Sequence, residues 1–180
     1  MDQLTAHQRA QDVFAGVLAN VKPDQLDAPS PCAEWNAKAI IDHVISGNQW
    51  VGQLVGREPT ALPDELGPAH AGSAVIAQES FAAPDGLTRT FNLPFGDFPG
   101  TAFIGLRTVD VFTHAWDLAK ATGQPTDLDP ELAAEALAAS KANINPAFRG
   151  PGRPFAAEQP CPEGRPTADA LAAFLGRSTD

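Results

Sequence analysis

Apolar side chains recur every three or four positions along most of this chain, which is the spacing of amphipathic helices. Proline and glycine separate these stretches, and Asn36, Asp129 and Thr167 each precede one, where a side-chain oxygen can cap a helix. The pattern predicts helices at residues 3–21, 37–56, 71–82, 100–122, 130–142 and 168–177. We therefore expect an all-α protein.

Residues 57–99 form the longest stretch without a continuous helical pattern. A bare loop of that length is unusual in a compact domain, which supports the helix predicted at 71–82. Residues 87–93 alternate apolar and polar side chains as a strand does, but no partner strand is evident, so we interpret them as an extended crossover segment. His70 directly precedes helix 71–82 and is expected in a surface loop, with a role as an additional metal ligand as the alternative.

The predicted helix at 100–122 carries a polar stripe on an otherwise apolar surface. Asp110 and His114 are four residues apart, so they lie one turn apart on the same face and can hold one ion between them. Arg107 and Asp117 extend the stripe by three residues at each end. Buried carboxylates and imidazoles are costly unless they are paired or bind a metal. The alternative is an exposed face, with Arg107 and Asp110 as an ion pair and Asp117 as a helix-end charge.

A second histidine, His43, falls within the predicted helix at 37–56, with Ile40 and Gly47 one turn to either side. This placement directs the imidazole toward the core, where a lone histidine is usually a packed, hydrogen-bonded residue. Together with Asp110 and His114, however, it forms a set of two histidines and one carboxylate. Such a set holds a divalent ion and leaves coordination positions open.

Length and charge limit the classes of function. With 180 residues the chain fits one domain, which we divide into a bundle at about 3–123 and a C-terminal extension at 124–180. Its 22 acidic and 12 basic residues give a net charge of −10, which disfavours nucleic acid and anionic membranes as partners. No signal peptide or membrane-spanning run is evident, so we expect a cytoplasmic protein. Cys32 and Cys161 are too few for a disulfide framework, and we interpret both as packed side chains.

Several blocks of sequence resemble one known family. They are Pro31-Cys32-Ala-Glu-Trp35-Asn, Asp42-His43, Leu93-Pro-Phe-Gly96, Asp110-Val-Phe-Thr-His114-Ala-Trp116-Asp117-Leu-Ala-Lys-Ala-Thr-Gly123 and Asp169-Ala-Leu-Ala-Ala-Phe174-Leu-Gly-Arg177. In this order they resemble the mycothiol-dependent maleylpyruvate isomerase family, within the DinB-like metalloproteins. The resemblance implies a four-helix bundle with a long crossover between helices two and three, followed by C-terminal helices. It also implies mycothiol as a cofactor and a metal held by His43, Asp110 and His114.

The resemblance and the residues together predict a metal-dependent enzyme that uses a small thiol such as mycothiol on an electrophile, as a thiol transferase or isomerase. Zinc is the expected ion, with nickel or another divalent ion as alternatives. We assign Arg107 and Asp117 to orienting a ligand or the polar groups of the thiol, with support of a metal ligand as a further role for Asp117. We assign the pocket wall to Trp35 and Trp116, with Trp50 as a further candidate. The characterised isomerase has a glutamate where this chain has Asp110, and it has a sizeable second domain. Isomerisation of maleylpyruvate itself is therefore not expected.

Two other classes of function use the same residues. A structural or sensory metal in a bundle that binds a partner protein would favour a closed site with four protein ligands. A metal-dependent hydrolase would activate water with the same three ligands. For the enzyme, the partners are a small-molecule thiol and an electrophilic substrate, and a homodimer remains open.

Overall fold

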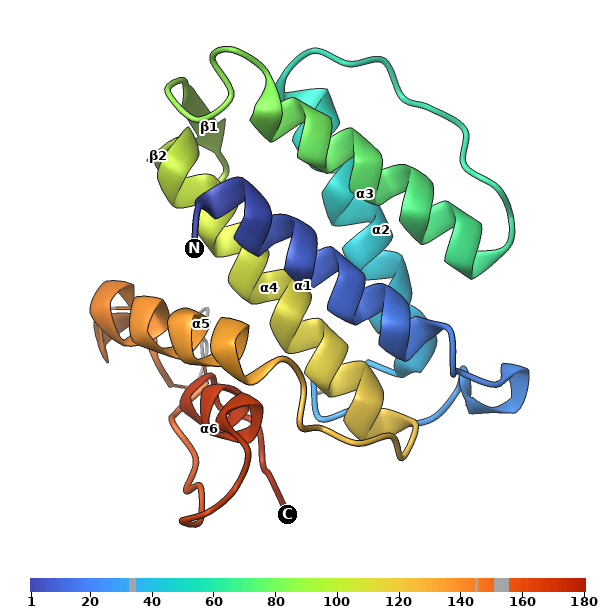
Figure 1. Ribbon diagram of the computed structural model, residues 1–180, viewed down its shortest axis with the longest axis vertical. Helices are drawn as coiled ribbons and strands as arrows, with labels where there is room; N and C mark the ends of the chain where they lie inside the picture. Colours follow the sequence, from blue (N-terminus) through green and yellow to red (C-terminus); the bar gives the residue numbers. More distant parts are fainter. Residues whose placement is uncertain (33–34, 145, 151–155) are drawn as a thin grey trace.

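Four long helices pack side by side, and two shorter helices lie against one side of this bundle (Figure 1). The computed structural model describes residues 1–32, 35–144, 146–150 and 156–180. The helices are α1 (Gln3–Leu18), α2 (Ala37–Leu54), α3 (Leu66–Ala82), α4 (Gly100–Ala121), α5 (Pro130–Asn143) and α6 (Thr167–Phe174). The protein is thus all-α apart from a small hairpin, with the DinB-like arrangement that the sequence predicted.

The connection between α2 and α3 runs back along the bundle, so that these two helices are parallel neighbours (Figure 1). This confirms the predicted long crossover. Going around the bundle, α1 packs on α4 and α3, and α2 packs on the same two helices. The groove between α2 and α4 and the groove between α1 and α3 therefore lie on opposite faces of the bundle. None of the described helices is both long and apolar enough to cross a membrane.

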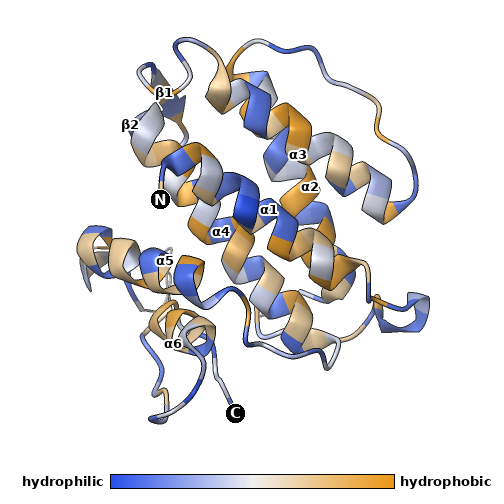
Figure 2. Ribbon diagram, in the orientation of Figure 1, coloured by the Kyte–Doolittle hydropathy of each residue, from blue (hydrophilic) through white to orange (hydrophobic). Residues whose placement is uncertain are grey.

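The core lies between α1, α2, α4, α5 and α6, and Figure 2 shows hydrophobic residues interspersed with hydrophilic ones along the helices. Among the fully buried side chains are Phe14, Ile41, Phe112 and Leu118. Helix α4 is buried along most of its length, because α1, α2, α5 and α6 all contact it. Polar residues of α4 are consequently enclosed by protein.

The structure corrects two predictions for residues 57–99. The predicted crossover strand has a partner, since β1 (Thr90–Leu93) pairs with β2 (Gly96–Pro99) as an antiparallel hairpin. Strand β2 was not evident from the sequence, because this polar segment ending in a proline lacks the alternation of apolar and polar residues that is typical of a strand. Helix α3 begins at Leu66 rather than at residue 71, so His70 lies in a helix and is only 2% exposed, not in a surface loop.

The helix caps agree with the sequence in two of three cases. The side chains of Asn36 and Asp129 accept hydrogen bonds from the first-turn amides of α2 and α5, as predicted. Thr167, however, is the first residue of α6 and the cap position is Pro166.

Trp116 of α4 and Asp169 of α6 connect the bundle to the C-terminal extension. The indole Nε1 of Trp116 donates a hydrogen bond of 2.8 Å to Oδ1 of Asp169, and both residues are almost completely buried. Arg165 pairs with the other carboxylate oxygen of Asp169 at 3.0 Å. A buried carboxylate must be paired in this way, so this contact fixes the position of α6 on α4.

Replacing Trp116 by Phe removes the indole donor and leaves Oδ1 of Asp169 buried without it. We expect the free energy of unfolding to fall by about 1–3 kcal/mol, measured by urea denaturation. Trp50→Phe is the matched control, because the Trp50 ring packs edge-on against Phe103 and its indole makes no hydrogen bond among the described residues. Equal losses for the two variants would show that the bond to Asp169 does not stabilise the docking of α6.

Candidate metal centre

His43 of α2 meets Asp110 and His114 of α4 in the groove between these two helices. The three residues each offer one ligand atom, and these atoms all lie within 4.8 Å of one another. Nε2 of His43 lies 3.4 Å from the Asp110 carboxylate, and Nε2 of His114 lies 3.6 Å from Oδ1 of Asp110. The structure thus brings together the three residues that the sequence assigned to a metal.

These separations fit a divalent ion. Ligand atoms about 2.1 Å from a tetrahedral ion are about 3.4 Å from one another, close to the two observed nitrogen–oxygen distances. The side chains of His43 and Asp110 are 35% and 27% exposed, whereas His114 is enclosed at 8%. One side of the cluster therefore faces outward, where a further ligand has access. Two imidazoles and one carboxylate suit zinc and neighbouring transition metals.

Arg107 orients the carboxylate of Asp110 relative to His114. Its Nη1 donates a hydrogen bond of 2.7 Å to Oδ2 of Asp110, which leaves Oδ1 directed toward His114. Burial by itself raises the pKa of Asp110, but the charge of Arg107 and the two histidines outweigh it and hold the pKa well below its ordinary value. Asp110 is therefore anionic throughout the physiological pH range.

Asp117 orients the imidazole ring of His114. Nδ1 of His114 lies 3.0 Å from Oδ2 of Asp117, which is fully buried. Burial raises the pKa of Asp117, yet the hydrogen bond from His114 and the charge of Arg177 bring it below its ordinary value. An ionised carboxylate only accepts hydrogen bonds, so Nδ1 carries the proton of His114. The lone pair of Nε2 is then directed toward the cluster, as a metal ligand requires.

Arg177 is a site residue that our sequence assignments did not include. It follows α6, and its Nη2 and Nε donate hydrogen bonds of 3.0 and 3.2 Å to the two oxygens of Asp117. No local pattern marks it, because it lies 60 residues from Asp117 in the sequence. The only signal was its place in the last block of the family resemblance. The C-terminal extension thus contributes to the centre.

The three tryptophans separate into different environments. Trp35 is stacked on the ring of His114 at a centroid distance of 5.5 Å and lies 4.8 Å from the ring of His43, so it forms a wall of the cluster. Trp116, expected in the same wall, instead points from α4 to Asp169 in α6. Trp50 belongs to the apolar cluster beside the hairpin.

A buried polar layer continues from Arg107 across the bundle. Nη2 of Arg107 reaches Oδ1 of Asn48 in α2 at 3.5 Å, and Gln11 of α1 donates to the same oxygen at 2.8 Å. Oε1 of Gln11 lies 3.0 Å from Nε2 of His70 in α3. Gly47 gives the guanidinium room, since a Cβ at that position would lie 2.6 Å from Nη2 of Arg107. His70, our alternative metal ligand, belongs to this layer and not to the metal cluster.

Cys32 lies near the centre. Burial raises the pKa of its thiol, with a further contribution from the negative charge of Asp117, whereas the positive charge of Arg177 acts in the opposite direction. Both Cys32 and Cys161 are free and partly buried, as the sequence suggested.

Comparison with known proteins supports the family. The model of the mycothiol maleylpyruvate isomerase N-terminal domain matches residues 7–93, a range that includes His43. Two proteins from two strains of Mycobacterium tuberculosis, both described as uncharacterized, are each 61% identical over 180 residues, covering 99% of this chain and 99% of theirs. No solved structure matches the chain. With the DinB-like bundle and the histidines and aspartate described above, these matches show that the chain belongs to the mycothiol maleylpyruvate isomerase family.

Proposed function

We propose that this protein is a metal-dependent enzyme that uses a small thiol, mycothiol, against a small electrophilic substrate. The observation that carries the proposal is the cluster of His43, Asp110 and His114, which is anionic at Asp110 and exposed on one side. The mycothiol family supports the choice of thiol. Thiol transfer and isomerisation both begin with attack by the sulfur, and we favour transfer for this chain.

The three residues would hold zinc or a similar divalent ion. Bound there, such an ion would accept the sulfur of the thiol at an open position and favour its ionised form near neutral pH. Among the described residues the cluster has three potential ligands, and a closed structural site usually has four. This favours an enzyme over a sensory or interaction module, whereas a hydrolase would use the same ligands.

For Arg107 and Asp117 we propose support of the metal ligands as the role, in place of direct contact with the thiol. Their side chains are 5% and 0% exposed, and their polar groups are directed at Asp110, Asn48, His114 and Arg177. Neither is accessible to a substrate. We propose that they are positioning residues: Arg107 orients the carboxylate of Asp110, and Asp117 fixes the protonation and the ring of His114. Trp35 supplies the apolar wall against which a flat substrate would rest.

We expect purified protein to bind about one divalent ion per chain, and His114→Ala or His43→Ala to remove it. The metal affinity should fall by more than about a hundredfold. Losing a residue that only supports a ligand typically lowers metal affinity by about 10–100-fold, so the loss of a ligand itself should exceed that range. Elemental analysis and competition with a chromogenic chelator measure both quantities. His70→Phe is the control, because His70 is a buried histidine outside the cluster and its loss should leave metal content unchanged. Equal metal in wild type and His114→Ala would contradict the ligand assignment.

Asp117→Asn tests the positioning role without touching a ligand. The substitution removes the charge that holds the proton on Nδ1 of His114, and it leaves Arg177 opposite a neutral amide. We expect metal affinity to fall by about 10–100-fold. The matched control is Asp42→Asn, an exposed carboxylate of α2 that pairs only with Lys38 among the described residues. If both variants bind the metal as wild type does, Asp117 does not support His114.

The reaction itself can be tested with mycothiol and a chloronitrobenzene, in which a carbon–sulfur bond forms and chloride leaves. The rate of product formation should rise in proportion to metal content, and His114→Ala should give only the uncatalysed rate.

Several thiols and electrophiles need to be compared, because the family suggests a small thiol and leaves the electrophile open. Metal-free wild type and Asp42→Asn serve as controls for the role of the ion and for non-specific effects of substitution. Equal rates for wild type and His114→Ala with every pair would reject the enzyme and favour the metal-binding interaction module.

A further inference from the structure

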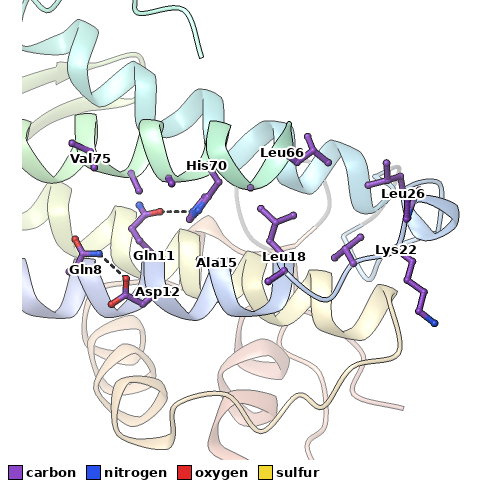
Figure 3. Close-up of a pocket in the computed structure, with 16 residues that line it drawn as sticks. Gln8, Gln11, Asp12, Ala15, Leu18, Lys22, Leu26, Leu66, His70 and Val75 are labelled. Carbon is purple, nitrogen blue, oxygen red and sulfur yellow. Dashed lines mark hydrogen bonds between the residues drawn. The ribbon is translucent and has the colours of Figure 1, made fainter. Parts of the chain in front are cut away.

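A cavity of about 530 Å³ opens between α1 and α3, on the face of the bundle opposite the metal centre (Figure 3). Its apolar lining comes from both helices and from the turn after α1, and includes Leu18, Val21, Leu26, Leu66 and Ala74. Gln11 and His70 lie at its inner side, where they join the buried polar layer. This size and composition are typical of pockets for small organic molecules.

The hydrogen bonds of the polar layer determine the tautomer of His70. A guanidinium only donates, so Oδ1 is the atom of Asn48 that faces Arg107, and Nδ2 of Asn48 then donates to Oε1 of Gln11. Since Oε1 of Gln11 is an acceptor, Nε2 of His70 carries the proton and donates to it. Nδ1 of His70 is left as an unprotonated acceptor.

The other end of the layer gives the same orientation. The amide of Gln78 donates to the carbonyl of Leu4, so its Oε1 accepts from Nδ1 of His7. Nε2 of His7 is then an acceptor and faces the amide nitrogen of Gln11. The hydrogen bonds at both ends of the layer therefore give Gln11 the same orientation, with Oε1 facing His70.

Nδ1 of His70 has no hydrogen-bond partner among the described residues, although His70 is only 2% exposed. This nitrogen is not completely buried, so a ligand in the cavity can reach it. Burial lowers the pKa of His70 to about 4, so the ring is neutral at physiological pH. A neutral acceptor at the inner side of an apolar cavity is suited to a ligand that donates one hydrogen bond.

The charged side chains of the cavity do not select a charged ligand. Asp12 accepts a hydrogen bond from Gln8 at 2.8 Å, and the amino group of Lys22 points away from the cavity (Figure 3). The remaining lining is neutral. We propose that the cavity between α1 and α3 is a second ligand site, which binds a small, uncharged, mainly apolar molecule through a hydroxyl group that donates to Nδ1 of His70. Because the polar layer separates it from the metal cluster, this ligand is distinct from the thiol and its substrate.

The test uses 2-naphthol, which is uncharged at neutral pH and has a hydroxyl donor, and 2-methoxynaphthalene, which has the same rings and no donor. Binding to metal-loaded full-length protein is followed by naphthalene fluorescence and by calorimetry. We expect saturable binding of 2-naphthol, about tenfold tighter than 2-methoxynaphthalene, as one hydrogen bond to a buried group provides. His70→Phe should remove this difference.

Ala71→Trp should abolish binding of both probes, since the exposed Ala71 lines the cavity and an indole there fills it. Ala134→Trp, at an exposed position of α5 outside the cavity, is the matched control and should bind as wild type does. His43→Ala should also leave binding unchanged, which separates this site from the metal centre. The proposal is overturned if neither probe binds saturably, if Ala71→Trp binds as Ala134→Trp does, if His70→Phe keeps the preference for 2-naphthol, or if binding is lost with His43→Ala.

Discussion

The pairing of ionisable side chains inside the bundle is the constraint on which the rest of the structure depends. Helix α4 brings Arg107, His114 and Asp117 along one stripe into a space enclosed by other helices. Asp110, whose side chain is 27% exposed, lies in the same stripe at its outer side. Removing such charges from water costs several kcal/mol for each ion unless a partner is held in place. The neighbouring helices must therefore supply fixed polar groups at the correct height along α4, which restricts how they can pack.

The partners come from two other parts of the chain. Helix α2 places His43 beside Asp110 and Asn48 beside Arg107, while Arg177 reaches Asp117 from beyond α6. Losing one partner of a buried pair typically destabilises a protein by about 3–5 kcal/mol, because the remaining charge stays uncompensated. The C-terminal extension is thus part of the centre as well as a cover for α4.

The polar layer gives the two faces of the bundle different chemistry. On the α2/α4 face, an anionic carboxylate and two imidazoles converge at a partly exposed position. On the α1/α3 face, the same layer ends in a neutral histidine and a glutamine beneath an apolar cavity. Gln11, Asn48 and Arg107 connect the two faces by direct hydrogen bonds, so one buried layer joins two surfaces of unlike chemistry.

The sequence by itself determined what local geometry controls. Helical periodicity located the long helices, Asn36 and Asp129 marked two of their starts, and the four-residue spacing placed Asp110 and His114 on one face. These follow from 3.6 residues per turn and from the need to cap free amides, which are properties of a few neighbouring residues.

Only the tertiary structure decided which distant residues meet. The set of two histidines and one carboxylate predicted that His43 meets Asp110, but nothing in the sequence predicted that His70 is buried beside Gln11. The contact of Arg177 with Asp117 and the separate environments of the three tryptophans likewise depend on segments far apart in the sequence. Strand β2 is close to its partner in the sequence, but it lacks a strand-like pattern of its own. The physical reason is that periodicity specifies the face of an element, whereas the neighbour of that face is set by how whole helices pack and by which buried charges must be paired.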